Sequence, residues 1–172
     1  MEPFQSHRLE QPPSYRQTCR CGPLPRDHTD QGVTITTDAP THANTAEIDA
    51  LAAADAIIDD FANHRRDAYF AGFAPDATFV FHSAPQRLNS RAEYETMWQG
   101  WESENGFAVE SCVSTDRMLQ LAGNVAIFTH SVETVARFDG VAELQHERET
   151  IVLELRDGRW LAIHEHLSAL TA

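Results

Sequence analysis

The chain has 172 residues, a formal net charge of −13 and no lysine, so its 13 basic side chains are all arginines. This length allows one domain with a hydrophobic core, and the acidic balance argues against a nucleic-acid or anionic-membrane partner. No apolar run is long enough to span a bilayer, and the N-terminus lacks the pattern of a signal peptide. Three cysteines, Cys19, Cys21 and Cys112, are too few for a disulfide framework, so we expect a reduced, cytoplasmic protein.

The first part of the chain, residues 1–42, holds six of the eight prolines and has almost no apolar periodicity. Such a segment buries too little apolar surface to offset the entropy lost on ordering. We expect a disordered, proline-rich tail here, in which Val33 to Thr37 could add a short strand. A single folded domain is expected over residues 43–172.

This domain is predicted to begin with a helix that is capped by Thr45 and runs to about Ala68, because apolar side chains follow helical spacing along it. After a break at residues 74–76, a strand is predicted that ends at His82.

A second helix is predicted between Ser90, its N-cap, and Gly106, where it ends. Tyr94, Trp98 and Trp101 are spaced three or four residues apart and therefore form one aromatic face.

Four antiparallel strands are predicted next, over residues 107–121, 125–138, 145–155 and 160–167. The Asp139-Gly140 and Asp157-Gly158 pairs stand between alternating apolar runs, which is a strong signal for a hairpin. The order of elements indicates an α+β fold in which a curved antiparallel sheet wraps over the N-terminal helices.

Carboxylates interrupt the otherwise aliphatic faces of the last two strands. Glu147, Glu149 and Glu165 have the same parity as Ile151 and Ile163, so each strand's members are expected on one face. A carboxylate on a core-like face needs a partner or a cavity. We therefore expect an inward-facing pocket.

The element order, with the runs Arg156–Trp160 and Ile163–Ser168, resembles the nuclear transport factor 2-like superfamily over about residues 45–170. Within it, the chain looks like the SnoaL-like branch and the hub domain of calcium/calmodulin-dependent kinase II. The resemblance implies a cone-shaped half barrel, a cavity between the sheet and the first helix, and a homodimer through the outer sheet face. It does not assign a reaction, because this fold hosts isomerases, cyclases, hydrolases and plain oligomerisation modules.

The ligand-binding residues follow from parity and from this implied cavity. The strand predicted over residues 125–138 is expected to turn its odd-numbered side chains inward. The second helix is expected to close the rim of the cavity. The predicted ligand contacts are Tyr94, Trp98, Trp101, Thr129, Ser131, Glu133, Glu147, Ile151 and Ile163. In hub-like relatives arginines bind an acidic ligand, but here those positions carry Ser131, Ile151 and Leu167, so a cationic or neutral polar small molecule fits better.

The candidate catalytic residues are His82, Glu149 and Glu165. A carboxylate near others in an apolar cavity has a raised pKa and can act as a general base, as can a neutral histidine near pH 7. Tyr94 or Ser131 would hold a developing oxyanion. If arginines such as Arg148, Arg137, Arg87 or Arg91 neutralise the glutamates, the chain is instead a non-catalytic binding or oligomerisation domain.

Four histidines, His130, His146, His164 and His166, offer an alternative metal site, because alternating histidines on strands can be ligands. The face that carries His164 and His166 also carries Trp160, and we expect it to be the outer face, buried in a homodimer. We therefore expect interface histidines without a metal. No glycine-rich phosphate loop or nucleophile elbow is present, so no cofactor is expected.

Overall fold

The computed structural model describes residues 40–170, with side chains from residue 45 onward. The predicted tail, with its possible strand at Val33 to Thr37, lies outside the described residues except for its last three positions. The elements are α1 (Pro40–Ala62), α2 (Arg66–Ala71), β1 (Phe73–Phe81), α3 (Arg91–Asn105), β2 (Ala108–Ala122), β3 (Val125–Phe138), β4 (Val141–Arg156) and β5 (Arg159–Ala169). No helix in this part of the chain is long and apolar enough to cross a bilayer.

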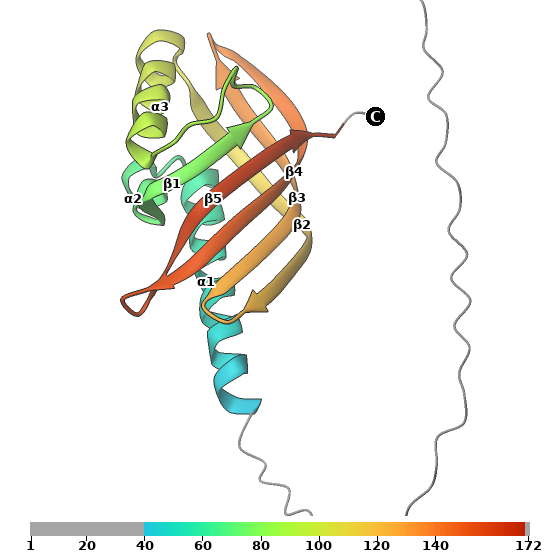
Figure 1. Ribbon diagram of the computed structural model, residues 1–172. Helices are drawn as coiled ribbons and strands as arrows, with labels where there is room; N and C mark the ends of the chain where they lie inside the picture. The colour runs from blue at the N-terminus through green and yellow to red at the C-terminus, as the bar shows by residue number, and fades with distance from the viewer. Residues whose placement is uncertain (1–39, 171–172) are drawn as a thin grey trace, which may run out of the picture. The chain divides into compact units, whose positions relative to one another are not determined.

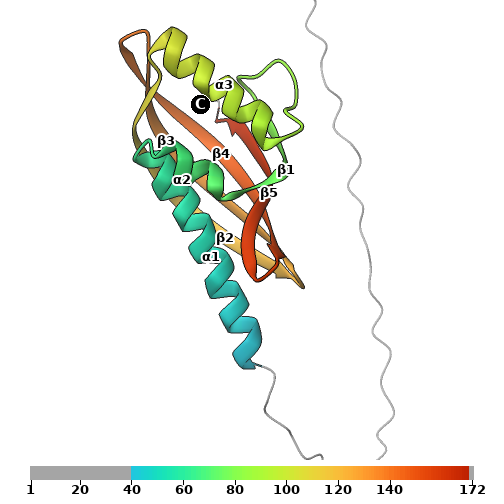
Figure 2. The same cartoon turned by 90° about the vertical axis from the view of Figure 1, so that its left-hand side faces the viewer.

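All three helices lie on one side of a five-stranded sheet with the order β1-β5-β4-β3-β2 (Figure 1, Figure 2). Strands β2 to β5 form the predicted antiparallel meander, and β1 joins its edge parallel to β5, with Phe81 opposite Leu167. The predicted break at residues 74–76 is wrong: these residues belong to β1, and the irregularity appears as a register shift between Phe73 and Thr78. The α+β fold with a curved, unclosed sheet is confirmed.

Helix α1 differs from its prediction at both ends. It begins at Pro40, a residue type favoured in the first helical turn, so Thr45 lies inside the helix and is not its N-cap. It ends at Ala62, and the chain turns at His64, whose φ is 52°, before α2 begins. The His64 ring holds this turn, because Nε2 lies 3.1 Å from a Glu102 oxygen and the backbone N–H of Val109 donates to Nδ1 over 3.0 Å.

Helix α3 has the predicted ends. The Ser90 side chain accepts a hydrogen bond from the backbone N–H of Glu93 over 3.1 Å, and Gly106 takes the left-handed conformation with a φ of 61°. Tyr94 and Trp98 point from α3 into the core.

Both predicted hairpins are confirmed. In each turn the two central residues have positive φ, which is the type I′ geometry that matches strand twist. The first turn places Phe138 opposite Val141, and from there the ladder runs without a shift to the far end of β3. Even-numbered side chains of β3 therefore share a face with odd-numbered side chains of β4.

The second hairpin contains a bulge. Val152 pairs with His164 and Leu153 pairs with Ala162, so Ile163 is an extra residue without a partner. A bulge reverses the parity of all the side chains beyond it. Trp160 and Ala162 therefore face the helices on one side of the bulge, and Glu165 does so on the other.

Candidate active site

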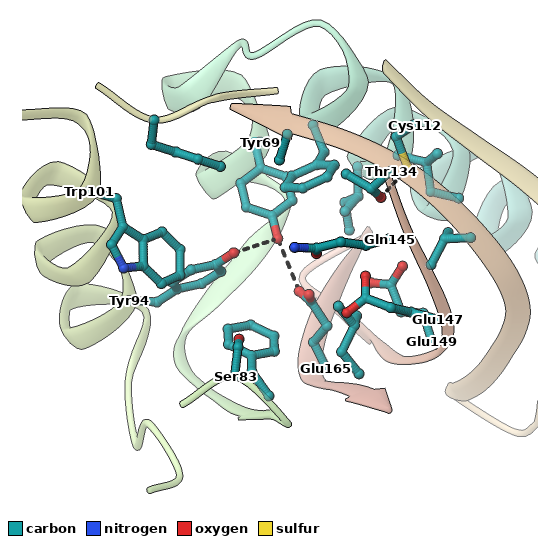
Figure 3. A pocket seen from close by; sticks show the side chains of 18 of the residues that line it. Tyr69, Ser83, Tyr94, Trp101, Cys112, Thr134, Gln145, Glu147, Glu149 and Glu165 are labelled. Carbon is teal, nitrogen blue, oxygen red and sulfur yellow. Dashed lines mark hydrogen bonds between the residues drawn. The ribbon is translucent and has the colours of Figure 1, made fainter. Parts of the chain in front are cut away.

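A cavity of about 230 Å³ lies between the helices and the inner face of the sheet. Its wall is mostly aromatic and aliphatic, with three glutamates on one side (Figure 3). The lining residues are Ile57, Ile58, Phe61, Tyr69, Phe81, Ser83, Tyr94, Trp101, Phe107, Cys112, Val132, Thr134, Ala136, Phe138, Gln145, Glu147, Glu149, Glu165 and Leu167. Of the predicted contacts, Tyr94, Trp101 and Glu147 line this cavity, together with the predicted catalytic residues Glu149 and Glu165.

No arginine reaches the three glutamates among the described residues. The arginines that form ion pairs do so with other carboxylates: Arg65, Arg66, Arg91, Arg117, Arg137 and Arg156. Neutralisation by arginine, which the sequence left open as an alternative, is therefore not found among the described residues, and each glutamate has a histidine or tyrosine partner instead.

Glu165 is the most enclosed of the three, with 3 % of its surface exposed. The Tyr69 hydroxyl donates to its Oε2 over 3.1 Å, and the same hydroxyl lies 3.5 Å from that of Tyr94 (Figure 3). Burial, followed by the charge of nearby Glu149, raises the pKa of Glu165 well above its usual value. Burial also raises the pKa values of Tyr69 and Tyr94, so both phenols keep their protons.

Glu147 is paired with His82, which comes directly after β1. Its Oε1 lies 2.5 Å from His82 Nε2, and the His82 side chain is 37 % exposed while that of Glu147 is 5 % exposed. Burial raises the pKa of Glu147, and the hydrogen bond with His82 opposes that shift. His82 does not line the cavity itself, but it connects a cavity carboxylate with the solvent.

Glu149 is paired with His130, whose side chain is fully buried. Glu149 Oε2 lies 2.7 Å from His130 Nε2, and His130 Nδ1 lies 2.8 Å from the Ser114 hydroxyl. These side chains come from the neighbouring strands β4, β3 and β2. The chain of hydrogen bonds thus leads from the cavity wall toward the half-buried Ser114.

Three predicted ligand contacts on β3 are wrong. Thr129, Ser131 and Glu133 alternate with the buried side chains of the strand and lie on the outer face of the sheet. Ser131 therefore cannot hold an oxyanion in the cavity. The sequence signal for the inner face of β3 is the two-residue hairpin at Asp139-Gly140. Its register pairs even-numbered residues of β3 with odd-numbered residues of β4, so His130 lies opposite Glu149.

Ile151 and Ile163 do not line the cavity either. Ile151 is fully buried in the core, and Ile163 is the extra residue of the bulge in β5. The prediction that Trp160 lies on the outer face is wrong, because the same bulge turns it inward. Trp160 is 9 % exposed and packs in the core beneath the helices. The predicted outer patch of Trp160, His164 and His166 therefore does not exist as such.

Trp98 is a core residue, not a rim residue. It is fully buried, and its indole N–H donates to Glu102 Oε1 over 2.7 Å. That carboxylate also contacts His64, so Trp98 helps to fix α3 against the turn after α1.

The four histidines of the alternative metal site are not brought together. His130 faces inward, His146 lies on the outer face beside Glu133, His164 contacts the Thr78 hydroxyl over 2.8 Å, and His166 is exposed. Between residues 40 and 170, no group of three or more histidine, cysteine, aspartate or glutamate side chains has an arrangement that could hold a metal ion.

Sequence reasoning missed several polar residues of the wall. The sequence patterns do not single out Tyr69, Thr134 or Gln145, which line the cavity. Cys112 also lines the cavity: burial raises the pKa of its thiol to about 11, and the Thr134 hydroxyl lies 3.7 Å from its sulfur. A thiol that keeps its proton is a poor nucleophile at neutral pH.

A family model described as a SnoaL-like domain matches residues 50–172. No curated protein matches the chain. Among solved structures, a ketosteroid isomerase-like protein from Erwinia carotovora atroseptica superimposes with a TM-score of 0.63 at 17% identity, covering 75% of this chain and 99% of that one.

Two further structures show the same fold. A nuclear transport factor 2-like protein from Rhodospirillum rubrum has a TM-score of 0.61 at 17% identity, with 72% and 99% of the two chains covered. The calcium/calmodulin-dependent kinase II hub homology domain of Chlamydomonas reinhardtii has a TM-score of 0.57 at 16% identity, covering 73% of this chain and 98% of that one. The predicted resemblance to the nuclear transport factor 2-like superfamily is confirmed, and at these identities the structures establish the fold alone.

Proposed function

The chain belongs to the SnoaL-like domain family, and on that premise we propose that its cavity binds a small molecule and performs acid–base chemistry on it without a cofactor. The volume of about 230 Å³ suits a small molecule and not a polymer. The mostly apolar wall with a few convergent polar groups is typical of a small-molecule site.

One observation carries this proposal: the glutamates of one cavity have different surroundings. Glu165 is enclosed beside two phenols, and Glu147 is hydrogen-bonded to a half-exposed imidazole. Environments that separate the protonation states of neighbouring carboxyl groups are typical of acid and base pairs in enzymes. This arrangement supports assigning opposite roles to the two carboxyl groups.

We assign the base to the Glu147–His82 pair. Desolvation makes the Glu147 carboxylate more basic, and His82 can pass a proton on to solvent. In this chain the carboxylate comes from β4 and meets His82 from the side.

We assign the acid to Glu165, because desolvation and the charge of nearby Glu149 raise its pKa and so favour its protonated form. Its carboxyl group and the Tyr94 hydroxyl can donate hydrogen bonds to an oxygen that becomes negative, while the Tyr69 hydroxyl donates to Glu165. Glu149 acts through Glu165, because its negative charge raises the pKa of the Glu165 carboxyl group. The reaction class is removal of a proton from a carbon next to a carbonyl group, with Glu165 protonating the carbonyl oxygen.

The lining also restricts the ligand. It contains three glutamates and neither an arginine nor a histidine. An anionic ligand would meet carboxylates without a counter-charge, so a neutral polar or cationic carbonyl compound is favoured.

The experiment is hydrogen–deuterium exchange at carbon in D₂O, followed by NMR, with a panel of small neutral, cationic and anionic carbonyl compounds. We expect catalysed exchange for neutral or cationic members. Glu147→Gln should lower the rate by about 10²–10⁴-fold, the usual contribution of a general base. Glu143→Gln is the matched control, since Glu143 is an exposed carboxylate on the same strand.

The alternative is a non-catalytic binding or oligomerisation domain, and the observation in its favour is that every cavity glutamate has a hydrogen-bond partner. Saturable binding of a panel member without exchange of any of its carbon-bound protons would favour that alternative.

A further inference from the structure

Gln145 is a polar residue of the cavity wall that has no role in the proposed acid–base chemistry. It lies on β4 opposite Thr134 of β3, and its side chain points into the cavity (Figure 3). It has the same parity as Glu147, so both side chains leave the inner face of the sheet. The next strand places Glu165 opposite Ile151. Along β4, the base Glu147 therefore lies between Gln145 and the level of the acid Glu165.

The amide of Gln145 forms no hydrogen bond with the part of the chain that the structure describes. By contrast, the cavity glutamates are hydrogen-bonded to histidines or a tyrosine, and the Thr134 hydroxyl contacts the Cys112 sulfur. The amide has two N–H donors and one carbonyl acceptor, and it is half-buried in a mostly apolar wall. A ligand that covers this amide without hydrogen-bonding it would lose binding free energy, because the amide would give up its contact with water.

The reacting carbonyl group of the ligand does not need this amide. A carbonyl oxygen has two lone pairs, and in the proposed reaction the Glu165 carboxyl group and the Tyr94 hydroxyl supply two donors for them. Gln145 is therefore left for a different group of the ligand. That group is uncharged, because the amide offers no counter-charge and the nearby carboxylates would repel an anion and draw a cation toward themselves.

We propose that Gln145 determines the specificity of the cavity by hydrogen-bonding a hydroxyl group of the ligand, in addition to the carbonyl group at Glu165 and Tyr94. The ligand class is thus a neutral hydroxycarbonyl compound. This inference deepens the proposed function and rests on it for the position of the carbonyl group. Recognition of the hydroxyl by Gln145 requires no proton transfer, so the two can be tested separately.

The first test is binding, measured by NMR titration with two pairs of ketones whose members differ by one hydroxyl group. The pairs are cyclohexanone with 4-hydroxycyclohexanone, and 4-phenylbutan-2-one with 4-(4-hydroxyphenyl)butan-2-one, so the hydroxyl lies at two different distances from the carbonyl group. We expect the hydroxylated member of at least one pair to bind about three- to tenfold more tightly, the usual effect of one hydrogen bond. Equal affinities within both pairs, or no binding of any of these ketones, would overturn the inference.

The variant for this test is Gln145→Met, which removes the amide and keeps an unbranched side chain of similar length. It should lose the preference for the hydroxylated ketone and bind the parent ketone at least as tightly as the wild type. A purely structural role of Gln145 would instead weaken the binding of both ketones equally. Gln120→Met is the matched control, because Gln120 is an exposed glutamine on β2. If Gln145→Met does not fold, Gln145→Leu takes its place, and a preference that persists in the Gln145 variant would overturn the inference.

The second test measures hydrogen–deuterium exchange at carbon for the same ketones. The wild type should show the same preference in kcat/KM, and Gln145→Met should lose it through a higher KM for the hydroxylated ketone with kcat nearly unchanged, because the amide contacts no reacting atom. Catalysed exchange without any preference would retain the proposed reaction and reject the role of Gln145. Preferential binding that depends on Gln145, without exchange, would retain this role and reject the reaction.

Discussion

Strands β3 and β4 carry two histidine–glutamate pairs, one on each face of the sheet. The inner pair, His130 and Glu149, is 0% and 12% exposed and has an N–O distance of 2.7 Å. The outer pair, His146 and Glu133, is 50% and 55% exposed with a distance of 3.5 Å. In each pair, the histidine and the glutamate lie directly opposite each other in the ladder between β3 and β4.

The pairs differ in their exposure to solvent and not in the chemistry of their side chains. In the outer pair, water screens each charge and replaces the partner if it is lost. In the inner pair, little water can reach either group, so the loss of one side chain leaves the facing polar atom of the other without a replacement partner. A pair of the same composition is thus a surface contact on one face and a part of the candidate active site on the other.

The largest effect should come from breaking the inner pair. His130→Leu leaves the mostly buried Glu149 carboxyl group without its hydrogen bond to the imidazole, and we expect a loss of about 3 kcal/mol in the free energy of unfolding. His146→Leu should change this quantity by less than about 0.5 kcal/mol. Urea unfolding at pH 7 measures both. Similar losses for the two variants would show that the inner pair has no special dependence on burial.

The next effect is a gain of stability that depends on pH. The folded-state pKa of Glu165 is raised, so the stability linked to its proton is fully present below the unfolded value near 4.5 and is lost as pH rises through the folded value. Glu165→Gln removes that loss, since the neutral amide has no charge to desolvate. We expect a gain of about 0.5–2 kcal/mol at pH 8 that shrinks toward zero near pH 4.

Thermal unfolding of Glu165→Gln from pH 4 to 8 gives this profile, with Glu143→Gln as the exposed control. A Glu165→Gln variant that is less stable than the wild type at pH 8 would mean that the folded protein keeps Glu165 ionised.

A smaller effect is expected at Ser114 on β2, the second hydrogen-bond partner of His130. Ser114→Ala removes one hydrogen bond to His130 Nδ1, and we expect a loss of about 0.5–1.5 kcal/mol. Ser111→Ala is the matched control, because Ser111 is also half-buried on β2 but has no side-chain hydrogen bond in the described structure. Chemical unfolding of both variants isolates the contribution of that hydrogen bond.

The smallest effect on monomer stability is expected at the outer face, where Val113 and Leu144 are 52% and 58% exposed. We retain the prediction of a homodimer through this face, without Trp160. Leu144→Glu should leave the free energy of unfolding within about 0.5 kcal/mol and shift a dimer to a monomer at micromolar concentration. Light scattering measures this, and a wild-type monomer would reject the interface.

Local sequence determined the parts of this protein that depend on a few neighbouring residues. The Asp-Gly pairs specify type I′ turns because Asp and Gly tolerate positive φ, and Ser90 and Gly106 define both ends of α3. The fold class followed from the order of elements, and the unusual parity of Glu147, Glu149 and Glu165 indicated a cavity. These inferences needed no knowledge of distant contacts.

Tertiary structure decided which side chains share that cavity. The bulge at Ile163 moves Trp160 into the core and keeps Glu165 on the inner face, and a bulge depends on how both strands fit the curved sheet. The inner face of β3 could have been read from the hairpin at Asp139-Gly140, but the contact of His82 with Glu147 could not. It exists because β1 adds to the edge of the sheet in parallel with β5, which brings together residues 65 positions apart.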